Sequence, residues 1–137
     1  MPRRGFTLVE LLIVIVIVGI LAAGVFSFIN PAKRVRQAND AKIKTDVGQI
    51  SGALQGQYTL DQVYPSALSD LVTKGGLKTI PTPPGGGVYS YSVSSPCTPA
   101  SCEAAVSFAL QDPTASGNLW CWRSATGAPA EVASCAP

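Results

Sequence analysis

Residues 11–29 form an uncharged and mostly apolar run, which constrains the fold more than any other feature of this chain. At about 1.5 Å per residue, a helix of this length covers roughly 30 Å, the thickness of a bilayer core. Its β-branched residues would favour a strand in water, but in lipid the backbone must satisfy its own hydrogen bonds, which favours a helix. Arg3 and Arg4 precede the run and predict that the N-terminus stays in the cytoplasm.

Two other interpretations of this segment stay open. A secretory signal peptide would end at a small-residue cleavage site, and Ala22-Ala23-Gly24 could serve as one. Glu10 argues against it, because signal peptides seldom carry an acid at the start of the apolar run. The helical pattern also continues past Gly24 to Ala32. The second interpretation is a plain, uncleaved membrane anchor.

The charge balance and the residue types argue against nucleic-acid binding and against catalysis. Lys and Arg number 10 against 8 Asp and Glu, and the two signs balance once Arg3 and Arg4 are removed, whereas nucleic-acid binding needs a clustered basic surface. The chain has no histidine, the commonest general base. It also shows no Ser-His-Asp set and no phosphate-binding glycine motif. We therefore expect no enzyme activity, no cofactor and no metal site.

The residues Gly5-Phe6-Thr7-Leu8-Val9-Glu10, with Arg3-Arg4 before them and the apolar helix after them, resemble the processing site of type IV pilins and type II secretion pseudopilins. The resemblance covers roughly residues 3–32. It implies that a membrane-embedded aspartyl prepilin peptidase cuts between Gly5 and Phe6 on the cytoplasmic side. It also implies that the new Phe6 amine is methylated and that the apolar helix is retained.

The chemistry of Gly5 and Glu10 fits this resemblance. Gly5 has no side chain, so an extended backbone can enter a protease cleft closely. A carboxylate at the membrane edge is costly unless it is paired, and in a filament Glu10 can pair with the Phe6 amine of a neighbouring subunit. Such a pair would set the axial register, because a misplaced subunit leaves both charges unpaired. The alternative is that Glu10 only marks the end of the helix at the membrane interface.

The chain divides into four expected segments. They are a leader peptide (1–5), a transmembrane and polymerisation helix (6–32), an amphipathic helix continuation (33–57) and a globular head (58–137). Pro31 lacks an amide donor and should kink the chain at residues 27–30. Gly19 and Gly24 are also expected to interrupt the helix. They are either ordinary membrane-helix glycines or, as the resemblance implies, part of a stretch that partly unwinds in the assembled filament.

The continuation over residues 33–57 has the pattern of an amphipathic helix. Its apolar positions at helical spacing are Val35, Ile43, Val47, Ile50 and Leu54. Asp40–Lys44 and Lys42–Asp46 are expected to pair on its solvent side.

Two further groups of residues in this helix allow two interpretations each. The basic group is Lys33, Arg34 and Arg36, which could meet lipid headgroups or acidic groups of adjacent subunits, or could simply be solvated. The glycine group is Gly48, Gly52 and Gly56, whose cost in helix stability predicts either a closely packed strand or second helix, or a frayed helix end.

The head is expected to combine a short helix with an antiparallel sheet. A turn, a short helix and a glycine stop are predicted over residues 64–76. The expected strands are 88–93, 104–110 and 119–123. Packed on the outer half of the long helix, this three-stranded sheet gives an α+β fold. Trp120 and Trp122 share a strand face, either in the core or as an exposed binding platform.

Four cysteines, Cys97, Cys102, Cys121 and Cys135, lie in the last third of the chain. An even number in a small domain behind a membrane signal suggests disulfides in an oxidising compartment. The sequence does not fix the pairing. We favour Cys97–Cys102 and Cys121–Cys135, because each pair closes a loop next to a predicted strand. A four-cysteine zinc site is the alternative, although no tight Cys-x2-Cys spacing is present.

The head resembles pseudopilin heads more loosely, from Tyr64-Pro65 to Tyr89 and Tyr91. It departs at Pro83, where the secretion-type pattern usually has an aspartate. The late acidic loop that binds calcium in many secretion pseudopilins is not evident either, because the candidate carboxylates are scattered: Glu103, Asp112 and Glu131. These departures put calcium in doubt and favour a pilus-type subunit whose head is held by disulfides.

The resemblance therefore implies a structural subunit of a type IV pilus-like filament, a homo-oligomer built through its N-terminal helix. Its implied partners are the inner membrane, the prepilin peptidase, an assembly platform and an assembly ATPase. The precursor is expected as a single-pass protein of the inner membrane, and the filament as periplasmic or extracellular. The first alternative is a pseudopilin of a type II secretion or DNA-uptake system. The other is a membrane-anchored extracytoplasmic binding module.

Overall fold

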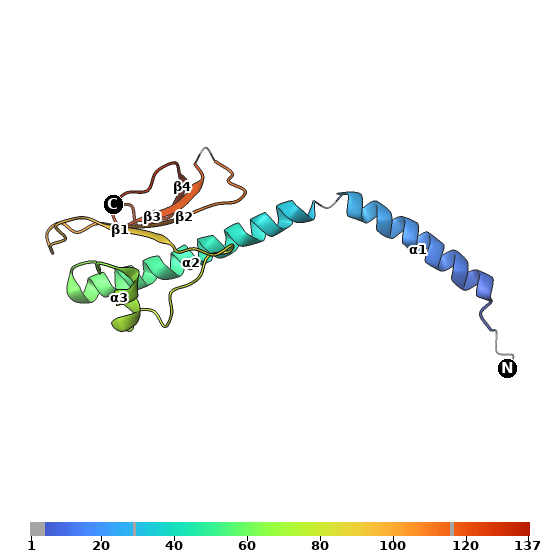
Figure 1. Ribbon diagram of the computed structural model, residues 1–137, viewed down its shortest axis with the longest axis horizontal. Coiled ribbons are helices and arrows are strands. Elements are labelled where there is room, and N and C mark those ends of the chain that lie inside the picture. The colour runs from blue at the N-terminus through green and yellow to red at the C-terminus, as the bar shows by residue number, and fades with distance from the viewer. Residues whose placement is uncertain (1–4, 29, 116) are drawn as a thin grey trace. The chain divides into compact units, whose positions relative to one another are not determined.

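The computed structural model describes residues 5–28, 30–115 and 117–137 (Figure 1). Its elements are α1 (Leu8–Phe28), α2 (Pro31–Asp61), α3 (Leu68–Thr73), β1 (Ser90–Val93), β2 (Ala104–Ala109), β3 (Leu119–Arg123) and β4 (Ala130–Val132). They fall into two compact units, Met1–Arg34 and Val35–Pro137, which are described separately below. The predicted α+β class, with long N-terminal helix and small antiparallel sheet, is confirmed.

The N-terminal helix ends where proline was expected to disturb it. α1 ends at Phe28 and α2 begins at Pro31. The Asn30 side chain accepts a hydrogen bond from the Lys33 amide at 3.1 Å, so an asparagine cap followed by proline in the first turn starts a new helix. Gly19 and Gly24 do not interrupt the helix of the single subunit, as expected for ordinary membrane-helix glycines. Both lie inside α1, because a single glycine costs a helix only about 1 kcal/mol. The alternative, that this stretch partly unwinds in the assembled filament as the resemblance implies, stays a prediction.

The second helix buries one face against the head. Ile43, Val47, Ile50 and Leu54 are fully buried, as the spacing predicted. Val35 is 59% exposed, which contradicts its predicted place on that face. The reason is that burial of α2 begins only at Asp40.

One of the two predicted ion pairs on α2 forms, between an exposed lysine and a buried acid. Lys42 pairs with Asp46, but Asp46 is only 6% exposed and also accepts the Tyr89 hydroxyl at 2.6 Å. Lys42 further donates to the Thr82 carbonyl at 2.8 Å. These hydrogen bonds therefore connect α2 to the loop before β1.

The other predicted pair, Asp40–Lys44, is wrong. Both side chains lie against the sheet layer: the Lys44 ammonium sits 4.6 Å from the ring centre of Trp120. Asp40 is buried and accepts the backbone amides of Gln111 and Asp112. The helix periodicity correctly placed Asp40 and Lys44 as neighbours along α2. In the folded head, however, Asp40 bonds the loop after β2 and Lys44 lies against Trp120 of β3.

The four strands form one antiparallel sheet in the order β1-β2-β3-β4. Three of them were predicted, whereas β4 was missed. Trp122 of β3 stands opposite Val106 of β2, and both point into the core. Trp122 is 1% exposed and Trp120 is packed at the core's edge, which answers the question of an exposed aromatic platform in favour of the core.

Short local features complete the head. α3 is followed by Gly75 at φ +78, a left-handed position that favours glycine and ends the helix. Cys97 is joined to Cys102 and Cys121 to Cys135, with Cα atoms 4.4 and 5.8 Å apart. This is the pairing that the loop positions favoured, and it leaves no free thiol to bind zinc.

Candidate functional site

α1 presents an apolar surface along its length. It is a helix of membrane-spanning length over Leu8–Val25, with a mean hydropathy of 3.0 and none of that window buried. Leaving a large apolar side chain in water costs about 1.5–3 kcal/mol. The helix therefore requires lipid or other helices around it.

Glu10 is the charged residue of α1, and it closes a reciprocal cap at the start of the helix. Its Oε2 atom accepts the Thr7 amide and the Thr7 hydroxyl, both at 2.9 Å. The Thr7 hydroxyl oxygen in turn accepts the Glu10 amide at 3.2 Å. This is a capping box, in which threonine and glutamate three positions apart satisfy each other's amides. No described residue bonds the second oxygen, Oε1.

Sequence reasoning missed the role of Thr7, although the Thr-x-x-Glu spacing signals it. The cap supports the interpretation of Glu10 as a helix-end residue. It is also compatible with pairing between subunits, because the box uses one carboxylate oxygen and orients the other.

The predicted cleavage point lies in an exposed, non-helical segment. Residues 5–7 precede α1, and the side chain of Phe6 is 79% exposed. A β-carbon added to Gly5 would meet no atom within 4 Å. The backbone between Gly5 and Phe6 is therefore accessible to a protease. Arg3 and Arg4 lie outside the described residues.

The basic group Lys33, Arg34 and Arg36 is largely solvent-accessible in the first turns of α2. None of the three forms an ion pair with a described residue. Their solvated arrangement agrees with the simplest of the predicted interpretations.

Two of the three residues of the glycine group of α2, Gly52 and Gly56, line an open groove. β-Carbons added to Gly48, Gly52 or Gly56 would meet nothing within 4 Å, so the expectation of a closely packed strand or helix at this face is wrong for the described chain. The frayed-end alternative is wrong too, since α2 continues to Asp61.

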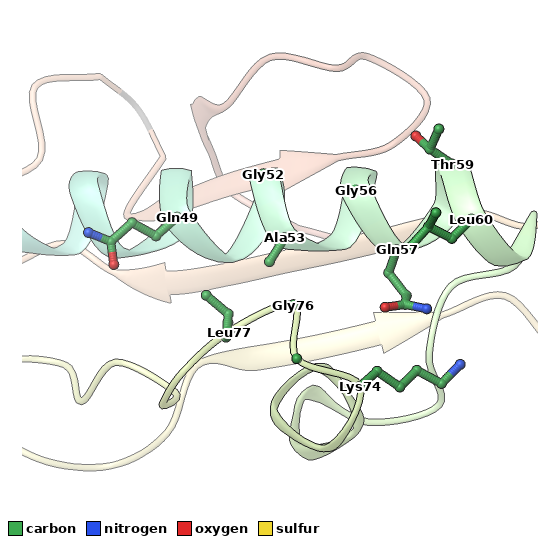
Figure 2. Close-up of a pocket in the computed structure, with 11 residues that line it drawn as sticks. Gln49, Gly52, Ala53, Gly56, Gln57, Thr59, Leu60, Lys74, Gly76 and Leu77 are labelled. Carbon is green, nitrogen blue, oxygen red and sulfur yellow. The ribbon is translucent and has the colours of Figure 1, made fainter.

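Figure 2 shows α2 forming one wall of this groove and the segment Lys74–Leu77 lying across from it. Two of the side chains that line the groove, Gln57 and Lys74, bond the nearby Asp61. Asp61 accepts both the Gln57 amide and the Lys74 ammonium, and these contacts, led by Lys74, hold the pKa of the Asp61 carboxyl below its ordinary value. The described groove thus offers no free pair of groups for acid–base chemistry.

Comparison with known proteins bears on the N-terminal segment first. Residues 1–26 match the family model of the prokaryotic N-terminal methylation motif. The chain is 37% identical over 105 residues to the type II secretion system core protein G of Vibrio cholerae serotype O1, an alignment that covers 65% of this chain and 70% of that protein. No solved structure shows a significant match.

A second relative extends the similarity. The chain is 39% identical over 111 residues to the type II secretion system core protein G of Pseudomonas aeruginosa, which covers 66% of this chain and 76% of that protein. Both alignments extend far beyond the apolar helix. With its methylation motif, its apolar first helix and its small antiparallel sheet, this chain belongs to the family of type IV pilins and type II secretion pseudopilins, the pilin-like filament subunits.

Proposed function

We propose that this chain is a membrane-inserted precursor that is cut between Gly5 and Phe6 and polymerises through α1 into a pilin-like filament. The observation that carries the proposal is α1 itself, an apolar helix of membrane-spanning length with a mean hydropathy of 3.0 over Leu8–Val25. A helix that served only the subunit's own fold would carry a polar face toward water, whereas residues 11–28 of α1 carry no charge. The match to the methylation motif supports cleavage with retention of this helix.

In this proposal each segment of the chain has a distinct task. Residues 1–5 are the leader that is removed, and residues 6–32 form the transmembrane and polymerisation segment. Residues 33–57 connect it to the head of residues 58–137, which carries the sheet and both disulfides. The Phe6 amine becomes the new N-terminus and is methylated.

Glu10 supplies the register of the polymer. In the membrane lipid covers α1, and in the filament neighbouring α1 helices do, so apolar burial changes little between the two states. The free Oε1 of Glu10 is available for the Phe6 amine of an adjacent subunit, while Thr7 holds Oε2. Burying either charge without its partner costs about 3–5 kcal/mol, which penalises a misplaced subunit.

The precursor is a membrane-anchored protein that becomes part of a periplasmic or extracellular filament, and its family is structural rather than enzymatic. We place the precursor in the inner membrane with a single span. A prepilin peptidase, an assembly platform and a cytoplasmic ATPase are its proposed partners, on the strength of the resemblance around Gly5–Glu10.

The test replaces Glu10 without destroying the cap. Glu10→Gln retains an acceptor that a capping box can use but removes the charge. We expect normal insertion and cleavage, with filaments reduced about tenfold or more, as a 1.4 kcal/mol penalty already implies. Filaments are counted by electron microscopy, and the precursor and mature chain by immunoblot.

Thr7→Val is the matched control, because it removes both bonds of the Thr7 hydroxyl in the capping box and keeps the carboxylate. We expect its filaments to stay near the wild-type level. If Thr7→Val abolished filaments and Glu10→Gln did not, Glu10 would act as a helix cap and the register role would be lost.

A second candidate function is suggested by the relatives, both of which are named type II secretion system core protein G. In that case this chain is a secretion pseudopilin and its filament stays in the periplasm. Deleting the chain would then abolish export of a secreted protein, without loss of a surface filament. A pilus subunit would give the opposite pattern.

A further inference from the structure

The β2–β3 loop, of which the structure describes residues 110–115 and 117–118, is held by carboxylates from two other elements of the head. Asp40 of α2 accepts the Gln111 amide through Oδ1 at 2.7 Å and the Asp112 amide through Oδ2 at 2.8 Å. Glu131 of β4 accepts the Thr114 amide through Oε1 and the Thr114 hydroxyl through Oε2, both at 2.7 Å. All four carboxylate oxygens therefore face hydrogen-bond donors of one loop.

This donor arrangement does not fit the calcium ion that the resemblance to secretion pseudopilins suggests. Calcium takes six to eight oxygen ligands at about 2.3–2.6 Å. Here the oxygens of Asp40 and Glu131 point at N–H and O–H hydrogens, whose positive charge would repel a cation. Within the described residues, no three Asp, Glu, Cys or His side chains gather closely enough to hold a metal.

A covalent bond fixes the other side of the same region. Cys121, 3% exposed in the middle of β3, is joined to Cys135 near the C-terminus. Arg123 reinforces this return of the chain by donating to the Ser134 carbonyl at 2.6 Å. Gly117 lies directly against the Val132 backbone, and a β-carbon there would clash with the Val132 carbonyl group. The loop, β4 and the C-terminal residues thus form one connected unit.

We propose that the head of this chain is held together by this clasp, formed by Asp40, Glu131 and the Cys121–Cys135 disulfide, and that its fold requires no divalent cation. The proposal concerns the head alone, so it stands or falls independently of filament assembly.

The test measures unfolding of the full chain in detergent micelles. Trp120 and Trp122 are the two tryptophans of the sequence and both lie in β3, so their fluorescence follows the clasp. Samples in excess EDTA, in millimolar CaCl2 and in dithiothreitol are compared. We expect midpoints in EDTA and calcium to agree within about 2 °C, and reduction to lower the midpoint by about 10 °C or more.

Variants separate the components of the clasp. Asp40→Asn should lower the midpoint and should remain unresponsive to calcium, whereas the exposed Glu103→Gln should match the wild type. Cys121→Ser with Cys135→Ser should lower the midpoint in the absence of reductant, and the further fall on reduction then measures the Cys97–Cys102 disulfide alone. If this double variant does not fold, the wild-type comparison of EDTA with calcium still decides the cation question.

Three results would overturn the proposal. One is a midpoint that falls in EDTA and is restored by calcium. Another is a wild-type midpoint that reduction leaves unchanged. The third is an Asp40→Asn protein as stable as the Glu103→Gln control.

Discussion

α1 and α2 are both long helices, but their side chains find partners in different places. No residue of α1 from Leu8 to Val25 is buried, whereas α2 buries Ile43, Val47, Ile50 and Leu54 completely. The acidic residues of the two helices differ in the same respect, namely where their hydrogen-bond partners lie. Glu10 bonds the adjacent Thr7 within the described chain, whereas the two buried acids of α2 reach the sheet and its loops. α2 is stabilised inside the subunit, and α1 depends on its surroundings.

Because the two helices find their partners in different places, substitutions in α1 and in α2 should disturb different properties of the protein. Changes on the buried face of α2 should unfold the head, and changes in α1 should alter membrane residence or assembly while the head stays intact. Each prediction below probes one side of the contrast in full-length protein in detergent micelles, by tryptophan fluorescence unless stated otherwise.

The largest effect is expected from a matched pair of isoleucines. Ile50→Ala, in α2, leaves a cavity beneath the sheet and should lower the free energy of unfolding of the head by about 2–5 kcal/mol. Ile15→Ala, in α1, should change it by less than about 0.5 kcal/mol, because Ile15 is 60% exposed. Equal losses from urea titrations of the two variants would contradict the contrast.

A smaller effect is expected where α2 meets β1. Burial, reinforced by the bond to Asp46, raises the pKa of the Tyr89 hydroxyl far above its ordinary value, so the hydroxyl stays a donor. Tyr89→Phe removes that hydrogen bond to a charged group and should cost about 1.5–3 kcal/mol.

Tyr58→Phe is the control for this change, because Tyr58 stacks on Tyr64 with ring centres 4.6 Å apart and phenylalanine keeps that stacking. Its midpoint in urea should match the wild type. If Tyr89→Phe matched the wild type as well, the buried network would not hold helix and sheet together.

Two glycines in open space should respond to alanine in opposite directions. Gly52→Ala adds a methyl group to α2 where no atom lies within 4 Å, and should stabilise the head by about 1 kcal/mol through helix propensity. Gly75→Ala also meets no atom, but Gly75 has φ +78 and alanine there should destabilise by more than about 0.4–1 kcal/mol. Thermal midpoints measure both, and a destabilised Gly52→Ala would mean that α2 has a close neighbour even in the isolated chain.

The smallest effect is a pH dependence of the head. Hydrogen bonds from Thr114 hold the pKa of the Glu131 carboxyl below its ordinary value of 4.5. A lowered pKa means that the stabilisation is fully present above pH 4.5 and is lost as the pH falls through the lowered value. Thermal midpoints between pH 7 and pH 3 should therefore fall less steeply for Glu131→Gln than for wild type, whereas the exposed Glu103→Gln should follow the wild type.

The sequence predicted most of what depends on local spacing. A periodicity of 3.6 residues predicted the buried face of α2 from Ile43 to Leu54, and a periodicity of 2 predicted the position of β3. The apolar run was evident from composition alone, and the folded structure agrees with all three. The break at Pro31 follows from the missing amide donor of proline. The motif around Gly5 and Glu10 was equally local, since it lies within six consecutive residues.

The failures arose where a distant segment decided the outcome. Asp40 was expected to pair with Lys44, because local spacing cannot foresee the amides of residues 111 and 112. β4 was missed because its three residues carry too short a pattern, and it is fixed by pairing with β3. The glycine group of α2 was expected to pack against another element. The loss of helix stability at glycine indicates that a partner is needed, but it does not say whether that partner lies in the same chain. Thr7 could have been found, since the capping box is a sequence signature.

Whether α1 is kept after cleavage and finds its partners in other subunits is tested by the intact mass of the chain purified from sheared filaments. We expect a chain that begins at Phe6, carries one added methyl group on that amine and retains every residue of α1. A chain that still begins at Met1, or one that begins near Val25 without the apolar helix, would contradict it.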